Sequence, residues 1–190
     1  MPIPNKARSE AMRQTLVDAA RSLFVEKGYA ETATPDIVAK AGVTRGALYH
    51  HFDDKKALFR AVVEREAADV AAAIEETPLS EHDPREAILG GTRRYFDAMA
   101  KQGRTRLLLL DGPSVLGADA MRALDEKTAE SSLRAGLEAL LKDTSHSDKA
   151  KEITMLLSAA FDRSALAMAS GADKRRLEDA IIALIDGLTT

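Results

Sequence analysis

Hydrophobic residues recur along most of the chain at the three- and four-residue spacing that is typical of amphipathic helices. The first such segment is expected to begin near Ser9 and to end at Gly28, and one of its faces carries Leu16, Ala20, Leu23 and Phe24. The last segment begins near Asp173 and places on one face Leu177, Ile181, Leu184 and Leu188. No segment shows the convincing alternation of a strand, so the pattern predicts an all-α fold.

Capping and stop signals divide the rest of the chain into further helices, for about nine in all. Thr34 precedes Pro35 and is expected to cap one helix, whereas Thr44 and the pair Asp53–Asp54 are expected to cap the next two. A helix break is expected at Gly112–Pro113. Between the first and last helices, the expected helices cover residues 35–41, 45–52, 55–76, 84–103, 105–111, 118–142 and 149–170.

The second and third expected helices are too short to fold alone, but the longer helices beside them can complete a compact three-helix head. Gly42 permits a sharp turn between them, Val43 is expected to fill the core, and Leu48 is expected to face inward. This is the organisation of a helix-turn-helix unit, whose second helix lies in the major groove of DNA. We therefore predict a DNA-binding domain over residues 1–60 and a second helical domain over residues 61–190.

The exposed start of the second short helix carries residues that suit DNA. Arg45 can donate to two acceptors of guanine at once, and the small residues after it let the backbone approach closely. The two polar rings that follow can reach a phosphate or a base, and Lys55 lies where its ammonium and the helix amides suit a phosphate. The candidate DNA-binding residues are Thr34, Thr44, Arg45, Gly46, Ala47, Tyr49, His50 and Lys55.

Simpler interpretations exist for some of these residues. Tyr49 fits a half-buried core position equally well, and Lys55 fits a solvated helix face. His50 and His51 do not suggest a metal site, because adjacent side chains point about 100° apart on a helix and no carboxylate has matching spacing. We expect neither a metal nor a cofactor.

Charge is distributed unevenly along the chain, whose net charge is −3. Residues 1–60 carry ten basic and seven acidic side chains, whereas the remainder carries seventeen basic and twenty-three acidic ones. A basic head on an acidic body is consistent with a polyanionic partner.

The absence of Cys excludes disulfides and thiolate chemistry. The longest aliphatic run, over residues 107–110, is far short of the roughly 20 residues of a membrane span, so we expect a cytoplasmic protein with no membrane partner.

Much of the predicted head resembles the TetR family of transcriptional repressors. The residues that carry the resemblance are LVDAARSLFVEKGY over 16–29, Thr34, DIVAKAGVTRGALYHHF over 36–52, Lys55 and Leu58. The resemblance covers residues 14–60 almost continuously, with Val38 where the family usually has Ala and Ala33 where Thr or Ser is common. Residues 61–190 resemble the family only in their number of helices.

The resemblance implies a homodimer that binds a palindromic operator in double-stranded DNA and is released by a small-molecule effector. It places the dimer interface on the last two helices, with the candidates Leu156, Leu157, Phe161, Leu177, Ile181, Leu184, Ile185 and Leu188. It places the effector pocket among the middle helices, with the candidates Tyr95, Phe96, Met99, Arg104, Leu107, Leu110, Asp111, Met121, Leu124, Met155 and Phe161. We hypothesise that the break at Gly112–Pro113 acts as a hinge that shifts a short helix when this pocket fills.

Two other functions are compatible with a helical chain. A small helical enzyme would need convergent titratable groups, but the sequence has no HExxH motif, no Gly-rich phosphate loop and no nucleophile elbow. Asp111 and Asp162 are each isolated on a helix, where a carboxylate is ordinarily capped or solvated. The other alternative keeps the DNA-binding head but uses the second domain to bind a protein partner instead of a small molecule.

Overall fold

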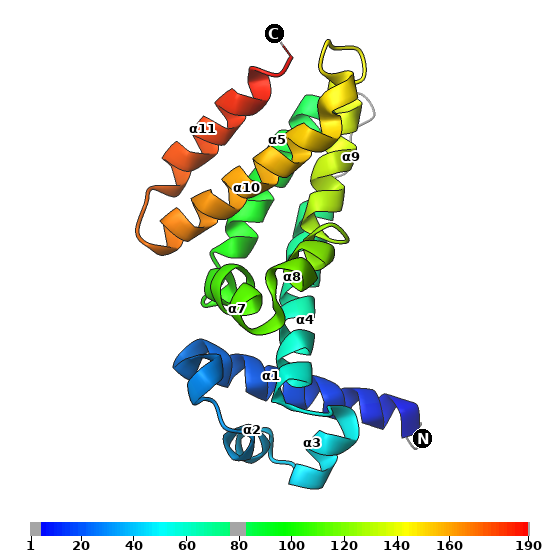
Figure 1. The fold of residues 1–190 in the computed structure, drawn as a ribbon, viewed down its shortest axis with the longest axis vertical. Coiled ribbons are helices and arrows are strands. Elements are labelled where there is room, and N and C mark those ends of the chain that lie inside the picture. The colour runs from blue at the N-terminus through cyan, green and yellow to red at the C-terminus, as the bar shows by residue number, and fades with distance from the viewer. Residues whose placement is uncertain (1–4, 77–82, 190) are drawn as a thin grey trace.

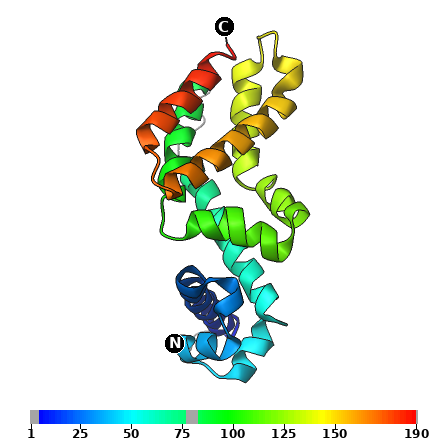
Figure 2. The same cartoon turned by 60° about the vertical axis from the view of Figure 1, so that its left-hand side comes forward.

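The computed structural model describes residues 5–76 and 83–189, and all regular secondary structure in these two ranges is helical. There are ten helices in the described chain when the continuous helical segment over residues 104–116 is counted as one. The molecule is elongated, with a small head of one long and two short helices at one end and a larger helical body at the other (Figures 1 and 2). The all-α prediction is therefore confirmed.

The head consists of α1 (Asn5–Glu31), α2 (Thr34–Ala41) and α3 (Arg45–His51). The first helix begins four residues before the expected Ser9, and its regular geometry is interrupted at Gly28, where φ is 83°. The head core is formed by fully buried side chains from α1, α2, α3 and the start of α4 (Lys55–Glu75): Leu16, Phe24, Ile37, Leu48, Leu58 and Phe59. Because the first turns of α4 complete this core, α4 belongs to both the head and the body.

Two of the three predicted caps in the head are confirmed. The Thr44 hydroxyl accepts a hydrogen bond from the Ala47 amide at 3.2 Å, and the Asp54 carboxylate accepts one from the Ala57 amide at 2.6 Å. The prediction that Thr34 caps α2 is wrong. The first intrahelical bonds run to the carbonyl of Ala33, so the helix starts one residue earlier and Thr34 lies within its first turn.

The body is built around α4, α5 (Pro84–Met99), α9 (Ala129–Leu141) and α10 (Ala150–Ala169), and α11 (Lys174–Asp186) lies beside α5 and α10 (Figure 1). The α5 helix ends at Met99, four residues before the expected end at Gly103. The short segment from Arg104 to Leu116 crosses the end of the body that faces the head (Figures 1 and 2). This crossing segment contacts α1 and α4 and so brings the body against the head.

The expected helix break at Gly112–Pro113 is not present. Helix α6 (Arg104–Arg106), a π-helical turn (Leu107–Asp111) and α7 (Gly112–Leu116) follow one another without interruption, and Gly112 itself is helical. Proline lacks an amide hydrogen and crowds the preceding turn of an α-helix. The π-helical turn, in which the Gly112 amide donates to the Leu107 carbonyl, accommodates Pro113 by widening that turn. The expected break is therefore wrong, whereas the hypothesis that this segment shifts when the pocket fills stays a prediction.

The expected long helix over residues 118–142 is in fact two helices, α8 (Ala118–Asp125) and α9. Residues 126–128 form a turn between them, held by hydrogen bonds from the Lys127 and Thr128 amides to carbonyls at the end of α8. No Gly or Pro marks this turn in the sequence, so its position was not predictable from local signals.

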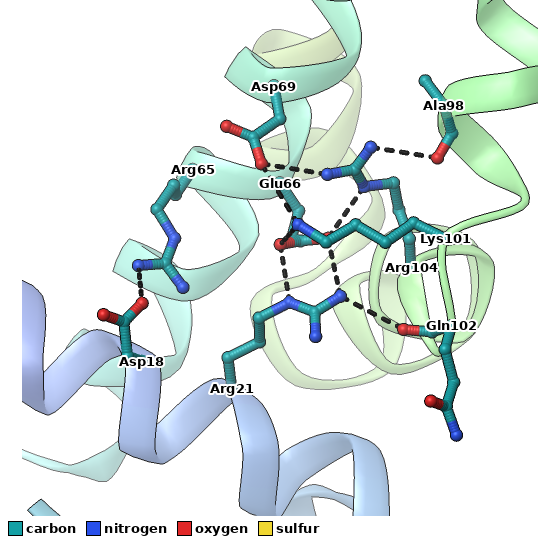
Figure 3. A network of polar contacts seen from close by, with 9 residues as sticks. All are labelled: Asp18, Arg21, Arg65, Glu66, Asp69, Ala98, Lys101, Gln102 and Arg104. Atoms are coloured by element: carbon teal, nitrogen blue, oxygen red, sulfur yellow. Dashed lines mark hydrogen bonds and ion pairs between the residues drawn. The ribbon is translucent and has the colours of Figure 1, made fainter.

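A buried network of ion pairs joins the head to the body, with Glu66 of α4 at its centre (Figure 3). The Glu66 side chain is fully buried, and its carboxylate accepts hydrogen bonds from Arg21 of α1 at 2.7 Å and from Arg104 of α6 at 2.8 Å. The same guanidinium groups extend to the carbonyls of Gln102 and Ala98. Burial opposes the ionisation of Glu66, but the two arginines outweigh it and lower its pKa to about 2.

Removing the charge of Glu66 is expected to destabilise the chain. Glu66→Gln leaves the buried Arg104 and the partly buried Arg21 without the Glu66 carboxylate, and Arg104 keeps only its ion pair with Asp69. Such a loss costs about 3 kcal/mol in the free energy of unfolding. Chemical denaturation at pH 7 measures this difference, and Glu64→Gln, at an exposed position of the same helix, is the matched control.

The difference in the free energy of unfolding between wild type and Glu66→Gln should also depend on pH. Because the folded-state pKa of Glu66 is lowered from 4.5 to about 2, its contribution is complete above pH 4.5 and is lost as the pH falls towards 2. The stabilities of wild type and Glu66→Gln should therefore converge over this interval. A stability difference between the two proteins that stays constant from pH 7 to pH 3 would contradict the assignment of Glu66 as an ionised partner of the two arginines.

Candidate functional site

The helix α3 and the start of α2 lie at the end of the head that points away from the body (Figure 1). At the start of α3, Arg45 and Gly46 are exposed, Leu48 is fully buried as expected, and Tyr49 and His50 are exposed again. Tyr49 has 43% of its surface exposed, so the interpretation of it as a core aromatic is not supported. One face of this short helix therefore holds it in the head, and the other presents side chains to the surroundings.

The geometry of Arg45 leaves its guanidinium accessible. It lies over the Tyr49 ring, with 5.4 Å between Cζ and the ring centroid, and no ion pair joins it to a carboxylate among the described residues. A methyl group at Gly46 would meet no atom closer than the Thr44 hydroxyl at 3.9 Å. The start of α3 thus combines a cation that can donate two parallel hydrogen bonds with an open backbone surface beside it.

Lys55 does not extend outward as the phosphate-binding interpretation requires. Its ammonium donates hydrogen bonds to the carbonyls of Tyr29 and Thr32, both at 3.0 Å, and lies 4.4 Å from the centroid of the Tyr29 ring. These carbonyls belong to the end of α1 and the loop after it, so Lys55 fixes the position of α4 relative to α1. We therefore correct the assignment of Lys55 from a DNA contact to a structural contact.

The remaining predicted DNA-binding residues surround the same end of the head. Thr34 is half-buried in the first turn of α2, and Ala47 is half-buried behind the cap formed by Thr44. The rings of His50 and His51 pack edge to face, with 5.2 Å between their centroids. Within the described ranges, no three His, Cys, Asp or Glu side chains are grouped in a way that could hold a metal ion.

Two neighbouring cavities lie inside the body. The first has a volume of about 440 Å³ between α4, α5, α9 and α10, and the second has a volume of about 390 Å³ closer to α7 and α8. Six residues line both cavities and are called the shared wall here: Tyr95, Asp125, Ala129, Glu130, Ser158 and Asp162. Volumes of this size are within the range of small-molecule sites in proteins.

The shared wall contains three partly buried carboxylates, and two of them, Asp125 and Asp162, accept hydrogen bonds from hydroxyl groups of the same wall. The Tyr95 hydroxyl donates to Asp162 at 3.0 Å, and the Ser158 hydroxyl donates to Asp125 at 3.1 Å. Burial and the nearby Asp125 raise the pKa of Asp162 to about 6, against the opposing effect of the Tyr95 hydrogen bond. Burial likewise raises the pKa of Asp125, and burial together with Asp162 raises the pKa of Tyr95 well above its ordinary value.

The structure places only some of the predicted pocket residues at these cavities. Tyr95 lines both cavities and Phe161 lines the first, whereas the second is also lined by Met99, Met121, Leu124 and Met155. The other predicted pocket residues line neither cavity, and these are Phe96, Arg104, Leu107, Leu110 and Asp111.

Each of these five residues is engaged elsewhere, which corrects the prediction. Phe96 and Leu107 are fully buried in the core, and Leu110 is exposed on the π-helical turn. Arg104 belongs to the Glu66 network, and Asp111 forms an ion pair with Arg106. Apolar character and a position in the middle of the chain therefore do not distinguish residues of the core from residues that line a cavity.

Of the polar residues in the shared wall, only Tyr95 is among the predicted ligand contacts. The sequence predicts an ordinary capped or solvated carboxylate at Asp162, and the predicted pocket includes neither Asp125 nor Ser158. Asp162 and Ser158 are one helical turn apart on α10, and this i, i+4 polar pair within an otherwise apolar helix face was a usable signal. Asp125 could not have been found in this way, because the turn after α8 that positions it was not predicted.

The helices α10 and α11 have an exposed apolar surface. Leu156 is 64% exposed and Leu184 is 56% exposed, whereas four other predicted interface residues are buried inside the same chain: Leu157, Phe161, Ile181 and Ile185. Leu177 and Leu188 are half-buried. The predicted interface is therefore corrected for the four buried residues, because they belong to the core of the single chain and are not available to a second one.

Both parts of the chain match known sequence families. Residues 16–62 match the sequence family described as "Bacterial regulatory proteins, tetR family", and residues 85–190 match "Tetracyclin repressor-like, C-terminal domain". The second match alone covers more than half of the chain. None of the helices in the described ranges is long and apolar enough to cross a membrane.

Individual relatives agree with the family matches. The chain is 35% identical over 81 residues to a transcriptional repressor of Corynebacterium diphtheriae, a segment that covers 43% of each protein. It is 25% identical over 111 residues to a transcriptional activator of Mycolicibacterium smegmatis, covering 58% of this chain and 51% of the relative. The aligned segments thus span about half of each of these curated relatives.

Solved structures resemble the chain over nearly its whole length. A crystal structure of a TetR-family regulator from Pectobacterium atrosepticum is 29% identical, with a TM-score of 0.69, and the match covers 97% of this chain and 95% of that one. The agreement extends over the head, the body and the order of the helices. Together with the two family matches, it establishes that the chain belongs to the TetR family of DNA-binding transcriptional regulators.

Proposed function

We propose that this protein is a ligand-responsive repressor that binds a palindromic operator as a homodimer and is released by a small-molecule effector. The observation that carries the proposal is the accessible start of α3, where Arg45 has no carboxylate partner among the described residues and Gly46 lies in open space. In a helix-turn-helix protein, this part of the second helix contacts base edges in the major groove.

The proposed DNA contacts are divided between bases and backbone. Arg45 donates to a guanine, and Tyr49 and His50, which follow on the exposed face of α3, contact bases or phosphates. Gly46 and Ala47 let the backbone of α3 approach the groove, and the starts of α2 at Thr34 and of α3 at Thr44 lie near phosphates.

The second copy of the chain is proposed to pack on the exposed apolar face of α10 and α11, around Leu156 and Leu184. Exposed leucines at these positions are costly in water, and covering them in a two-fold interface removes that cost. Two heads held in this way can bind two half-sites about one helical turn apart.

Repression is favoured over activation because it needs only occupancy of the operator. The relatives support both possibilities, since one is named a repressor and another an activator. A small molecule is favoured over a protein partner because the body contains two cavities of ligand size. The cytoplasm, where the chromosome is accessible, is the proposed location.

The route from the cavities to the head is proposed to run through α4. Ala67 and Val70 line the second cavity and Ile74 lines the first, while Glu66 of the same helix holds Arg21 of the head. A ligand that moves α4 therefore changes the placement of the head. A coupling free energy of about 1–3 kcal/mol is enough to change operator affinity about 5–150-fold.

Arg45→Ala is expected to abolish specific recognition. Loss of a bidentate contact to guanine costs ~1–3 kcal/mol in each half-site, so specific binding should approach binding to random DNA. Fluorescence anisotropy with DNA from upstream of the protein's own gene, at two salt concentrations and with random-sequence competitor, measures this change. Lys142→Ala removes the same charge at an exposed position after α9 and should bind like wild type. An equal loss of specific DNA affinity in both variants would mean that binding depends only on the total charge of the protein.

The double variant Leu156→Asp, Leu184→Asp is expected to produce a folded monomer. Two carboxylates cannot be buried in an apolar interface without partners, whereas both positions are exposed in the single chain. Analytical ultracentrifugation should show the 20.5 kDa mass of one chain, with unchanged helical circular dichroism. Leu110→Asp, at another exposed leucine, should remain dimeric. A variant that is still dimeric would place the interface elsewhere.

A further inference from the structure

The two cavities differ from an ordinary apolar pocket in the charge of their walls. Four acidic residues line the first cavity, namely Glu75, Asp125, Glu130 and Asp162, and none of its lining residues is Lys or Arg. The second cavity includes one basic residue, Arg122, which is largely exposed and already forms ion pairs with Asp119 and Glu126.

The four acidic residues are not equivalent. Glu130 is compensated by Arg134, with an ion pair of 2.7 Å, and Glu75 is exposed at the rim. Asp125 and Asp162 instead lie in the shared wall and accept hydrogen bonds only from neutral donors, which are the Ser158 hydroxyl and the Glu130 backbone amide for Asp125 and the Tyr95 hydroxyl for Asp162. Neither aspartate has a cationic side chain within ion-pair distance among the described residues.

Two partly buried carboxylates without a cation are unfavourable when they are ionised. Burial removes hydration and raises the pKa of both groups. The charge of Asp125 helps to raise the pKa of Asp162 to about 6, and the charges of Glu130 and Glu126 help to raise that of Asp125. An ammonium group placed between them would donate hydrogen bonds to both and remove the repulsion. An anionic ligand at the same place would increase it.

The remainder of the first cavity suits an apolar ligand body. Its wall includes Ile74, Ile88, Leu133 and Phe161, and the Phe161 ring packs against Tyr95 with 5.1 Å between the ring centroids. An aromatic or aliphatic group that enters between α4, α5 and α9 would be covered by these side chains. The Tyr95 and Phe161 rings also lie beside the carboxylates, where a cation can contact an aromatic face.

We infer that the effector is an organic amine cation, with its ammonium group at Asp125 and Asp162 and an apolar body in the first cavity. This inference rests on the proposed ligand-responsive function and specifies the chemical class of its ligand. It assigns Asp125 and Asp162 as the residues that select charge. The apolar side chains of the first cavity contribute affinity without selecting charge.

The test compares three probes that share one apolar body and differ only in their terminal group. They are 4-phenylbutylamine, 4-phenylbutanol and 4-phenylbutyrate, titrated into the full-length protein by isothermal calorimetry at pH 7.5. The amine should bind about tenfold or more tightly than the alcohol, because it forms charge-assisted hydrogen bonds, and the carboxylate should bind most weakly.

Substitution of the selecting residues should remove this preference. In Asp125→Asn and in Asp162→Asn, the amine and the alcohol should bind with similar affinity, and folding should be preserved because each variant removes an uncompensated charge. Asp119→Asn, an exposed position on the same helix as Asp125, is the matched control and should keep the preference. Three results would overturn the inference: no amine binding by the folded wild type, equal binding of amine and alcohol, or a preference that survives both variants.

A measurement of operator release distinguishes a failure of this inference from a failure of the proposed function. The same three probes are added to the complex of protein and operator DNA while its anisotropy is recorded. An amine that binds at the shared wall but leaves the DNA bound supports the ligand class and contradicts the proposed release. Release by the alcohol or the carboxylate, but not by the amine, supports ligand-responsive release and overturns the amine inference.

Discussion

Glu66 lies where the head, α4 and the connection between α5 and α6 meet, and its buried carboxylate is bound by a guanidinium group from either side (Figure 3). A buried carboxylate of this kind is stable only while both partners remain in place, so the position of α1 is tied to the position of α6. The neighbouring Lys101 and Asp69 extend the network to the surface. This network therefore couples the position of the head to the position of the body.

The placement of the cavities supports the proposed ligand-responsive function. The helix that carries Glu66 also lines both cavities through residues one to nine positions further along, so the proposed ligand site and the head share one helix. The shared wall lies on α5, α8, α9 and α10. In the proposed function, a ligand held at this wall acts on α4, and through Glu66 on α1.

Local signals predicted α2 and α3 well because these short helices are bounded by clear start and stop residues. Thr44, Asp54 and the glycine after α2 each have a direct structural consequence that a single residue can specify. The body was less predictable because its important features depend on contacts between distant segments. The turn between α8 and α9 has no local signal, and it places Asp125 at the wall that Asp162 of α10 also lines. Lys55 was misinterpreted for the same reason, since its carbonyl partners come from another helix.

If the exposed start of α3 recognises a defined DNA sequence, an unbiased selection will reveal that sequence. Wild type and Arg45→Ala are each used to recover fragments from a random DNA library, followed by sequencing. We expect wild type to enrich an inverted repeat whose half-sites are about one helical turn apart, and Arg45→Ala to enrich none. Fragments of the same sequence recovered by both proteins, or no common sequence recovered by wild type, would contradict this expectation.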